Sequence, residues 1–237
     1  MNNKKVYLET YGCSANQNNS EIIAGLLNQA GYQLTKNQEN ADILILNTCV
    51  VKKKTENKIK RKIQDLSNLK SDRLTIVTGC MPDSDSSSIK KLNPKAKLLS
   101  SHNIKSIVQL VNNNYSTLPI VNNNYNYLQK NNEEKILLPK ISFNPFISIT
   151  QILVGCLSRC TFCKTKLAKG NLFSYDMDKI ISSIENDLKN GAKEVWLTSQ
   201  GNECYGMDKG EQKLPELVKN ICNLNYDFKI RIGMMNP

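Results

Sequence analysis

The fold is decided by one stretch, Phe146-Ile-Ser-Ile-Thr-Gln-Ile-Leu-Val-Gly-Cys-Leu-Ser-Arg-Cys-Thr-Phe-Cys163. Its first half is apolar enough for a buried strand, and Cys156, Cys160 and Cys163 then follow in a C-x3-C-x2-C run. Thiolates this close in one loop can hold three irons of a 4Fe–4S cluster, which normally takes four cysteines. Because the next cysteine is the distant Cys204, the run predicts a cluster with one iron open to a ligand that is not protein.

A zinc site or three structural thiols are the alternative interpretations of this run. Structural zinc sites favour a C-x2-C pair matched with a second pair or with histidines. The chain has one histidine, His102, which is far from the run in sequence and which we expect in a surface loop. The spacing therefore favours a cluster over zinc.

Composition sets limits on the class of protein. The chain has 237 residues, 40% of them hydrophobic, and eight cysteines. It has no apolar run long enough to cross a membrane, and residues 1–8 lack the pattern of a signal peptide. We therefore expect a cytoplasmic protein that does not bind membranes, in which the cysteines serve metal or redox chemistry and not disulfides.

The formal net charge is +11. Such an excess suggests a polyanionic partner, most plausibly nucleic acid. The alternative is a basic surface kept for solubility or a lysine-rich genome, which the many Asn and Lys residues would also explain.

Strand-like and helical patterns alternate through the first part of the chain. Apolar runs predict strands over residues 5–10, 41–47, 73–78 and 97–100, and helical spacing predicts helices over 20–30, 54–69 and 104–111. This alternation predicts an α/β fold, with a doubly wound parallel sheet over residues 1–111.

Each of the first three predicted strands is followed by a cysteine, namely Cys13, Cys49 and Cys80. The carboxyl ends of parallel strands meet at one edge of the sheet, where such folds bind ligands. We therefore expect these thiols to converge and to hold a second three-thiolate cluster. Gly12 and Gly79 directly precede two of them, and a residue without Cβ lets the backbone approach a bulky cluster. Taken singly, each is more often an inert core cysteine.

Residues 112–145 are weakly patterned and are expected to form a linker, with an Asn-Asn-Asn-Tyr echo at 112–115 and 122–125. Further strands are predicted over 146–154, 194–198 and 228–233, with helices from an N-cap at Asp176 to Gly191 and over 214–224. Residues 146–237 thus read as the first three βα units of a partial β/α barrel, which are too few to close.

Motifs along nearly the whole chain match one enzyme family. They are Tyr11-Gly-Cys-Ser-Ala-Asn16, Leu46-Asn-Thr-Cys-Val50, Thr78-Gly-Cys-Met-Pro82, Leu138-Pro-Lys140, Gly155 to Lys166, Val195-Trp-Leu-Thr-Ser-Gln200, Tyr205-Gly206 and Arg231-Ile-Gly-Met-Met-Asn-Pro237. On these residues the chain resembles the N-terminal half of the radical SAM tRNA methylthiotransferases, in the archaeal and eukaryotic threonylcarbamoyladenosine branch.

The resemblance implies an N-terminal methylthiotransferase domain with an auxiliary cluster on Cys13, Cys49 and Cys80, followed by a radical SAM barrel. The barrel cluster would bind S-adenosyl-L-methionine and cleave it reductively to a 5′-deoxyadenosyl radical. The implied activity is 2-methylthiolation of N6-threonylcarbamoyladenosine at position 37 of tRNA. Ser199 and Gln200, at a strand end where barrels place their sites, are expected to touch this cofactor.

The implied partners are tRNA and an electron donor such as a ferredoxin or flavodoxin. The C-terminal half of the barrel and the TRAM domain of the family have no counterpart in this sequence. We therefore expect either a split gene, in which a second polypeptide supplies them, or a truncated chain, and a decaying gene is the remaining alternative. Two other functions stay open. They are methylthiolation of an aspartate on a ribosomal protein, and a non-catalytic iron–sulfur scaffold.

Four positions depart from the family pattern, and several other residues have predicted roles outside the cluster sites. Leu167 stands where relatives have histidine, Lys169 where they have arginine, Gly201 where they have aspartate, and Glu203 where a small residue is common. Lys164, Lys166 and Lys169 are candidates for phosphate contacts or a solvated basic face. We expect Asn16 to cap a helix, although it could bond a cluster sulfur instead. Cys204 and Cys222 are expected to be structural.

Overall fold

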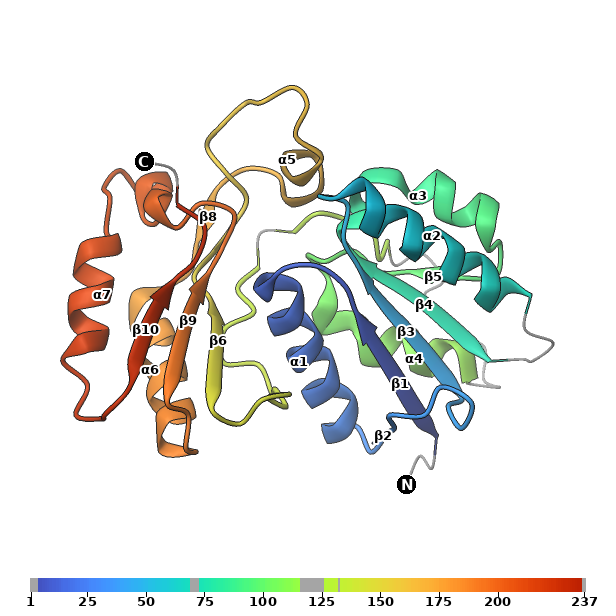
Figure 1. Ribbon diagram of the computed structural model, residues 1–237, viewed down its shortest axis with the longest axis horizontal. Helices are drawn as coiled ribbons and strands as arrows, with labels where there is room; N and C mark the ends of the chain where they lie inside the picture. The colour runs from blue at the N-terminus through green and yellow to red at the C-terminus, as the bar shows by residue number, and fades with distance from the viewer. Residues whose placement is uncertain (1–3, 69–72, 116–125, 132, 236–237) are drawn as a thin grey trace. The chain divides into compact units, whose positions relative to one another are not determined.

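The computed structural model describes residues 4–68, 73–115, 126–131 and 133–235. The second half of the Asn-Asn-Asn-Tyr echo, at 122–125, lies outside them. The chain divides into two compact units, Met1–Asn131 and Asn132–Pro237, which are described separately (Figure 1).

The first unit is built on a five-stranded parallel sheet with the order β2-β1-β3-β4-β5. Its strands are β1 (Lys5–Thr10), β2 (Gln33–Leu34), β3 (Ile43–Thr48), β4 (Leu74–Gly79) and β5 (Lys97–Leu98). Every residue of β3 and β4 is buried, as expected for central strands with both faces covered. The predicted doubly wound sheet is confirmed, and the short edge strand β2 is an addition.

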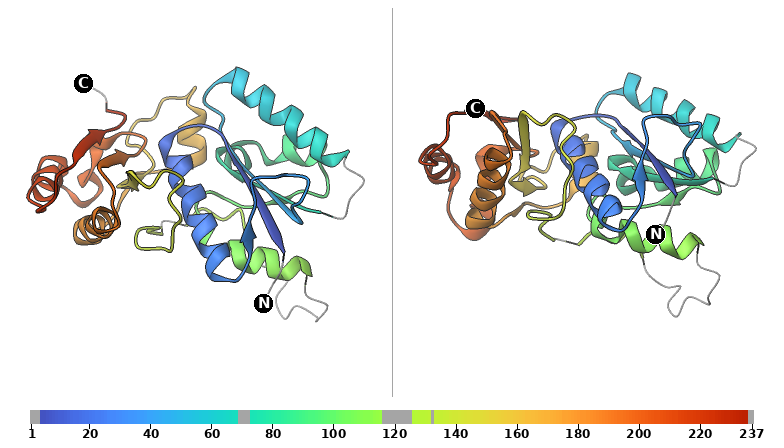
Figure 2. Two further views of the ribbon diagram at one scale, coloured as in Figure 1. Left: turned by 60° about the horizontal axis from the view of Figure 1, so that its bottom comes forward. Right: turned by 90° about the horizontal axis from the view of Figure 1, so that it is seen from below.

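Helices cover both faces of this sheet, with α1 and α4 on one side and α2 and α3 on the other (Figure 2). Their bounds are α1 Ser14–Gln29, α2 Lys53–Ser67, α3 Cys80–Leu92 and α4 Ile107–Tyr115, the last preceded by a 3₁₀ turn at Ile104–Ser106. The sequence pattern missed α3, because this segment is mostly polar. The helix also continues past residue 111, where the linker was predicted to begin.

Helix α1 begins at Ser14, six residues before the predicted start at 20. The apolar pattern missed residues 14–19 because most of their buried side chains are polar. Asn16 and Ser20 are fully buried. The Ser20 hydroxyl accepts hydrogen bonds from Thr10 Oγ1 at 2.7 Å and from Asn47 Nδ2 at 2.8 Å. Hydrogen bonds to the strand ends thus replace apolar contacts at the start of this helix.

Two expectations near the end of the first unit need correction. His102, expected on the surface, is 4% exposed. Part of the predicted linker, at Tyr127 and Gln129, packs on the first unit through hydrogen bonds. Ser100 N donates to the Tyr127 carbonyl at 2.8 Å, and Asn103 Nδ2 donates to the Gln129 carbonyl at 2.6 Å.

The second unit contains a parallel sheet with the order β10-β9-β6. Its strands are β6 (Ile147–Gln151), β9 (Glu194–Thr198) and β10 (Lys229–Ile232), and helices α6 (Met177–Lys189) and α7 (Leu214–Cys222) cover one face. Asp176 caps α6, accepting from Lys179 N at 3.1 Å. This arrangement confirms the predicted start of a β/α barrel.

Shorter elements connect these strands and helices. An antiparallel pair, β7 (Leu153–Val154) and β8 (Phe173–Ser174), flanks the cysteine loop, which ends in α5 (Lys164–Lys169). Two 3₁₀ turns, Asn202–Cys204 and Met207–Lys209, lie between β9 and α7.

The two faces of the three-stranded sheet differ in character. Val195 and Leu197 of β9 belong to the core shared with α6 and α7. Trp196, between them, points to the opposite face, as alternation along a strand requires. There the Arg231 guanidinium lies 4.4 Å from the Trp196 ring centre. Among the described residues, no helix is long and apolar enough to span a membrane.

Candidate cluster-binding sites

The first candidate site lies at the carboxyl edge of the five-stranded sheet. Cys13 caps α1 just after β1, Cys49 follows β3, and Cys80 opens α3 directly after β4. The strands β1, β3 and β4 are neighbours in parallel register, so all three cysteines emerge at the same edge. Cys13 is exposed, whereas Cys49 and Cys80 are buried.

Gly12 lies at this edge in a backbone conformation and at a contact distance that a residue with a Cβ would not tolerate. Its φ is +107°, and a Cβ there would lie 2.7 Å from Cys49 Cβ and 2.9 Å from Cys49 Sγ. Backbone next to Cys13 therefore touches the Cys49 side chain. This close approach is what a shared cluster requires of its ligand loops.

Asn16 connects the three cysteine segments. Its Nδ2 donates to the Tyr11 carbonyl at 2.8 Å and to the Thr48 carbonyl at 2.9 Å, just before Cys13 and Cys49. Its Oδ1 lies 4.0 Å from Cys80 Sγ, at the limit for a thiol hydrogen bond. The helix-cap expectation for Asn16 is therefore wrong, because Cys13 occupies the cap position.

We expect Asn16→Ala to destabilise the first unit. It would leave the buried Tyr11 and Thr48 carbonyls without this donor, at about 1–3 kcal/mol for each group that stays unsatisfied. Urea unfolding of the chain measures the loss. Asn114→Ala is the matched control, since the Asn114 amide donates to Leu110 O within its own helix. Equal stability of the two variants would contradict the role of Asn16.

The second candidate site is the loop between β7 and α5, at the carboxyl end of the sheet in the second unit. Cys156 and Cys163 are partly buried and Cys160 is exposed. Backbone amides already donate to two of the sulfurs, Ser158 N to Cys156 at 3.4 Å and Lys166 N to Cys163 at 3.3 Å. Amide donors of this kind stabilise thiolate ligands and tune cluster potentials.

Gly155 holds the start of the loop against its end. With φ at +81°, a Cβ on Gly155 would lie 1.9 Å from the Asn171 carbonyl oxygen. Its amide donates to Gln200 Oε1 at 2.9 Å, and the Cys156 amide donates to the Gly170 carbonyl at 3.4 Å. The loop is thus closed at its base by contacts that a larger residue at 155 would break.

The two residues predicted to contact the cofactor have protein partners at the end of β9. Gln200 bonds the Gly155 amide. The Ser199 hydroxyl donates to Asn202 Oδ1 at 2.7 Å and accepts from Gly201 N at 3.1 Å. Both therefore shape the strand end beside the loop, and contact with the cofactor stays a proposal.

The three lysines after the loop differ in exposure, and Lys164 is exposed, as a solvated basic face requires. Lys169 is 2% exposed, so it is not available to phosphates. Lys166 Nζ donates to the Cys156 carbonyl and, at 3.2 Å, to Asn171 Oδ1. The phosphate-contact interpretation is wrong for Lys169, and Lys166 braces the loop.

Cys204 was expected to be a structural thiol, and its burial is consistent with that role. Cys204 is buried, and burial raises the pKa of its thiol, with further contributions from Glu203 and Cys156.

Within the described residues, no three His, Cys, Asp or Glu side chains surround a single point as ligands of one metal ion would. Cluster cysteines bind separate irons and surround the cluster from several sides. The donor set of each site, three cysteines with close backbone approach at Gly12 and Gly155, fits a 4Fe–4S cluster.

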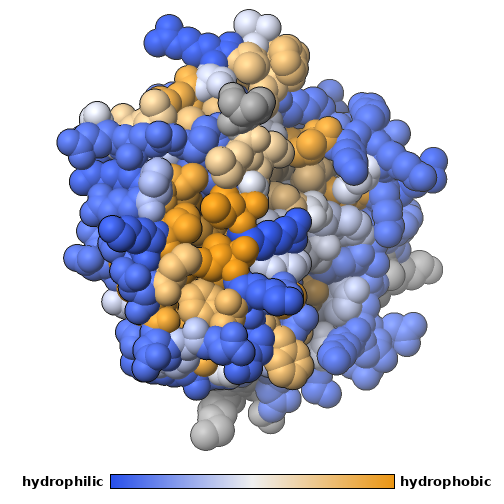
Figure 3. Space-filling model, turned by 60° about the vertical axis from the view of Figure 1, so that its left-hand side comes forward, coloured by the Kyte–Doolittle hydropathy of each residue, from blue (hydrophilic) through white to orange (hydrophobic). Residues whose placement is uncertain are grey.

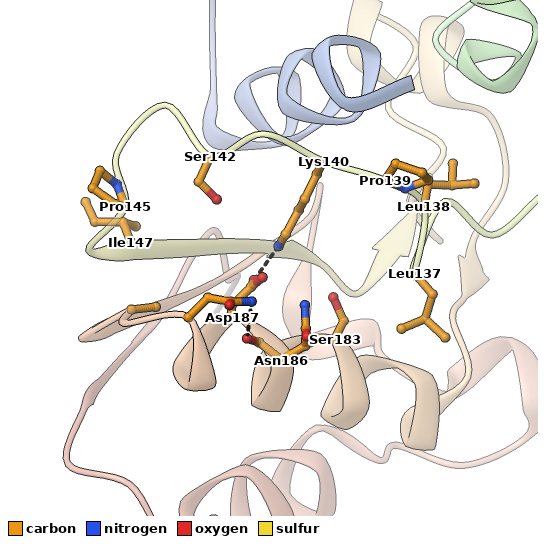
Figure 4. A pocket seen from close by; sticks show the side chains of 12 residues that line it. Leu137, Leu138, Pro139, Lys140, Ser142, Pro145, Ile147, Ser183, Asn186 and Asp187 are labelled. Carbon is orange, nitrogen blue, oxygen red and sulfur yellow. Dashed lines mark hydrogen bonds and ion pairs between the residues drawn. The ribbon is translucent and has the colours of Figure 1, made fainter. Parts of the chain in front are cut away.

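A hollow of about 570 Å³ lies at the opposite end of the same barrel unit (Figure 4). It is lined by residues of the Leu137–Pro145 segment, β6 and α6. Lys140 pairs there with the mostly buried Asp187, which also accepts from the Ser148 hydroxyl. Residues at the amino-terminal ends of barrel strands usually contribute to stability and not to catalysis. We therefore infer that the Lys140–Asp187 ion pair holds in place the segment that leads into β6.

We expect Lys140→Met to destabilise the second unit by roughly 3–5 kcal/mol, since it strands a buried carboxylate. Thermal or urea unfolding measures the change. Lys189→Met is the control, because Lys189 and Glu185 form an exposed pair at 3.1 Å and exposed pairs contribute little. If both variants unfolded alike, Lys140 would not be the anchor of this segment.

Comparison with known proteins finds relatives over nearly the whole chain. Residues 5–101 match a family described as "Uncharacterized protein family UPF0004". A probable threonylcarbamoyladenosine tRNA methylthiotransferase of Pyrococcus horikoshii is 37% identical over 233 residues, or 98% of this chain and 53% of the relative. The human threonylcarbamoyladenosine tRNA methylthiotransferase is 32% identical over 239 residues, or 99% of this chain and 40% of the relative.

The chain is homologous to the threonylcarbamoyladenosine tRNA methylthiotransferases. The predicted resemblance is therefore confirmed. The chain spans about half the length of the archaeal relatives it matches.

A solved structure shares the fold. It is the radical S-adenosylmethionine methyltransferase TsrM from Kitasatospora setae, with a TM-score of 0.57 and 9% identity. The match covers 92% of this chain and 50% of TsrM. At this identity the likeness supports the architecture alone.

Proposed function

We propose that this chain is the N-terminal half of a tRNA methylthiotransferase, which attaches a methylthio group to C2 of N6-threonylcarbamoyladenosine at position 37 of tRNA. The observation that carries the proposal is the C-x3-C-x2-C loop, closed at its base by Gly155 and Gln200 at the carboxyl edge of a parallel sheet. Homology to threonylcarbamoyladenosine tRNA methylthiotransferases over almost all of this chain supports the choice of substrate.

The proposal assigns one 4Fe–4S cluster to Cys156, Cys160 and Cys163 and a second to Cys13, Cys49 and Cys80. When bound, the first would supply the electron that cleaves S-adenosyl-L-methionine, and the second would hold the sulfur to be delivered. The protein's own residues contribute ligation and orientation. The amides of Ser158 and Lys166 bond the loop sulfurs.

The partners follow from charge and chemistry. A net charge of +11 favours association with an RNA backbone. Reductive cleavage needs an external electron donor, for which a ferredoxin or flavodoxin is suited. Action on tRNA would place the protein in the cytoplasm.

A complementing C-terminal half would complete the barrel at β10. This strand pairs with β9 alone among the described strands, which leaves its other edge open. Ile232, Met234 and Met235, in and after the strand, are exposed. Figure 3 brings the β10 side of the molecule forward and shows hydrophobic residues gathered on it. An open edge beside exposed hydrophobic residues is suited to further strand pairing.

Nucleoside mass spectrometry of total tRNA tests the function. Deleting the gene should abolish the methylthiolated nucleoside and leave its unmodified precursor. Returning the gene together with its complementing half should restore it, and the C156A/C160A/C163A variant should not. An unchanged nucleoside after deletion would overturn the proposal. A lost aspartate methylthiolation on a ribosomal protein would assign the chain to that reaction instead.

A further inference from the structure

Helix α2 and the residue before it concentrate positive charge. Residues 52–62 contain seven of the chain's 32 basic residues and a single acidic residue. Four of the basic side chains are exposed and, among the described residues, have no carboxylate within ion-pair distance; they are Lys52, Lys54, Lys58 and Arg61. A general lysine enrichment would spread these charges along the chain, so their clustering in 11 of 237 positions calls for a local cause.

The remaining basic side chains of this segment already have partners. Lys60 pairs with the buried Glu56 carboxylate at 2.8 Å, and Lys53 lies 3.8 Å from the same carboxylate. Lys62 pairs with Glu9 of β1 at 3.3 Å. The carboxylates that border α2 are therefore occupied, and the exposed charges remain available to an anion from outside.

Three of the exposed charges form a row along the helix. Lys54, Lys58 and Arg61 are spaced four and three residues apart, which places them on one helical face, and they span about 10 Å. We call these three residues the α2 stripe. The apolar residues of α2 are all buried, namely Ile59, Ile63 and Leu66. A helix that binds a membrane surface needs an apolar face to insert, so α2 is suited to a polyanion in water and not to lipid.

Helix stability does not explain these lysines. Positive charge near the start of a helix opposes the helix dipole, and positive charge near its end stabilises it. In α2 the arrangement is reversed, because Lys52 occupies the N-cap position and Lys53 and Lys54 open the first turn, whereas the last turn has no basic residue and contains Asp65. This reversal costs stability, which favours a role in binding.

The stripe lies beside the first candidate cluster site. Helix α2 begins four residues after Cys49, at the carboxyl edge of the five-stranded sheet (Figure 1). Lys58 Nζ lies 5.5 Å from the ring centre of Tyr11, and Tyr11 is two residues before Cys13. An anion on the stripe would therefore lie next to the edge at which these cysteines emerge.

We propose that the α2 stripe binds the phosphate backbone of the tRNA substrate. The identity of the RNA rests on the proposed function. Contacts to phosphates carry no sequence information, but they fix the position and orientation of a nucleic acid. The stripe would thus hold the tRNA next to the cluster assigned to Cys13, Cys49 and Cys80.

The test compares the full, anaerobically reconstituted chain with two variants that each lose three positive charges, K54Q/K58Q/R61Q in the stripe and K36Q/K95Q/K97Q outside it. The control lysines are exposed residues of the same unit. Fluorescence anisotropy measures binding to a labelled tRNA transcript from about 50 to 200 mM salt. Vesicles of phosphatidylserine and phosphatidylcholine are titrated in parallel, and circular dichroism checks the fold.

We expect the stripe variant to remain folded, since it loses a charge that opposes the helix dipole. It should bind tRNA roughly tenfold or more weakly at the lowest salt, and the slope of log affinity against log salt should fall by about 2–3. The control variant should keep most of the affinity and the slope of the unaltered chain.

Equal tRNA affinity and equal slope in the two variants would overturn this inference. So would an unaltered chain that does not bind tRNA at the lowest salt, or stripe-dependent binding to the vesicles without binding to tRNA. Stripe-dependent tRNA binding, together with an unchanged nucleoside after gene deletion, would overturn the proposed function and leave the RNA-binding surface in place.

Discussion

Anaerobic reconstitution of the C156A/C160A/C163A variant is expected to yield about four irons and four sulfides per chain, where the unaltered chain yields about eight of each. The loop lies in one compact unit and the second cysteine set in the other. Each cysteine set also has its own close backbone contact, at Gly155 for the loop and at Gly12 for the other set. Loss of one cluster should therefore leave the other in place.

The reciprocal C13A/C49A/C80A variant should also retain about four irons. Iron and sulfide analysis, with the visible absorbance of each variant, measures both results. C222A should keep the full content. Iron content that stayed unchanged after removal of either set would exclude that set as ligands, and iron that vanished entirely in both variants would point to one shared cluster.

Gly155→Ala is expected to damage the cysteine loop far more than Gly170→Ala. Both glycines flank this loop with positive φ, at +81° and +72°, so both substitutions strain the backbone by about 1–3 kcal/mol. A Cβ at 155 also meets the Asn171 carbonyl at 1.9 Å, whereas a Cβ at 170 meets nothing within 4 Å. The added overpacking should cost roughly another 1–3 kcal/mol.

Denaturant unfolding of the two variants measures this difference, and iron content after reconstitution reports on the loop. Gly155→Ala should lose cluster iron, and Gly170→Ala should retain most of it. Equal stability and equal iron in the two variants would show that the close approach of residues 155 and 171 is dispensable.

Apolar runs predicted the parallel sheets well. The bounds of β1 and β9 match their predicted ranges, because each segment is a short run rich in β-branched, aromatic and apolar residues. The polar first turn of α1 and the polar helix α3 escaped detection. Their burial depends on contacts with strand ends that are distant in sequence, which a local pattern cannot register.

The same limit applies to the candidate sites. Strand topology was enough to predict that Cys13, Cys49 and Cys80 emerge at one sheet edge. The role of Asn16 was not predictable, since it joins three backbone segments that only the fold brings together.

The unpaired side of β10 has a practical consequence for anyone who purifies this polypeptide without a companion. Among the described strands, this edge of β10 has no strand partner, and together with the exposed methionines after it the edge offers a template for a second copy. Self-association that grows with protein concentration would then mimic a native oligomer. Sedimentation at several dilutions distinguishes such adventitious pairing from a genuine assembly.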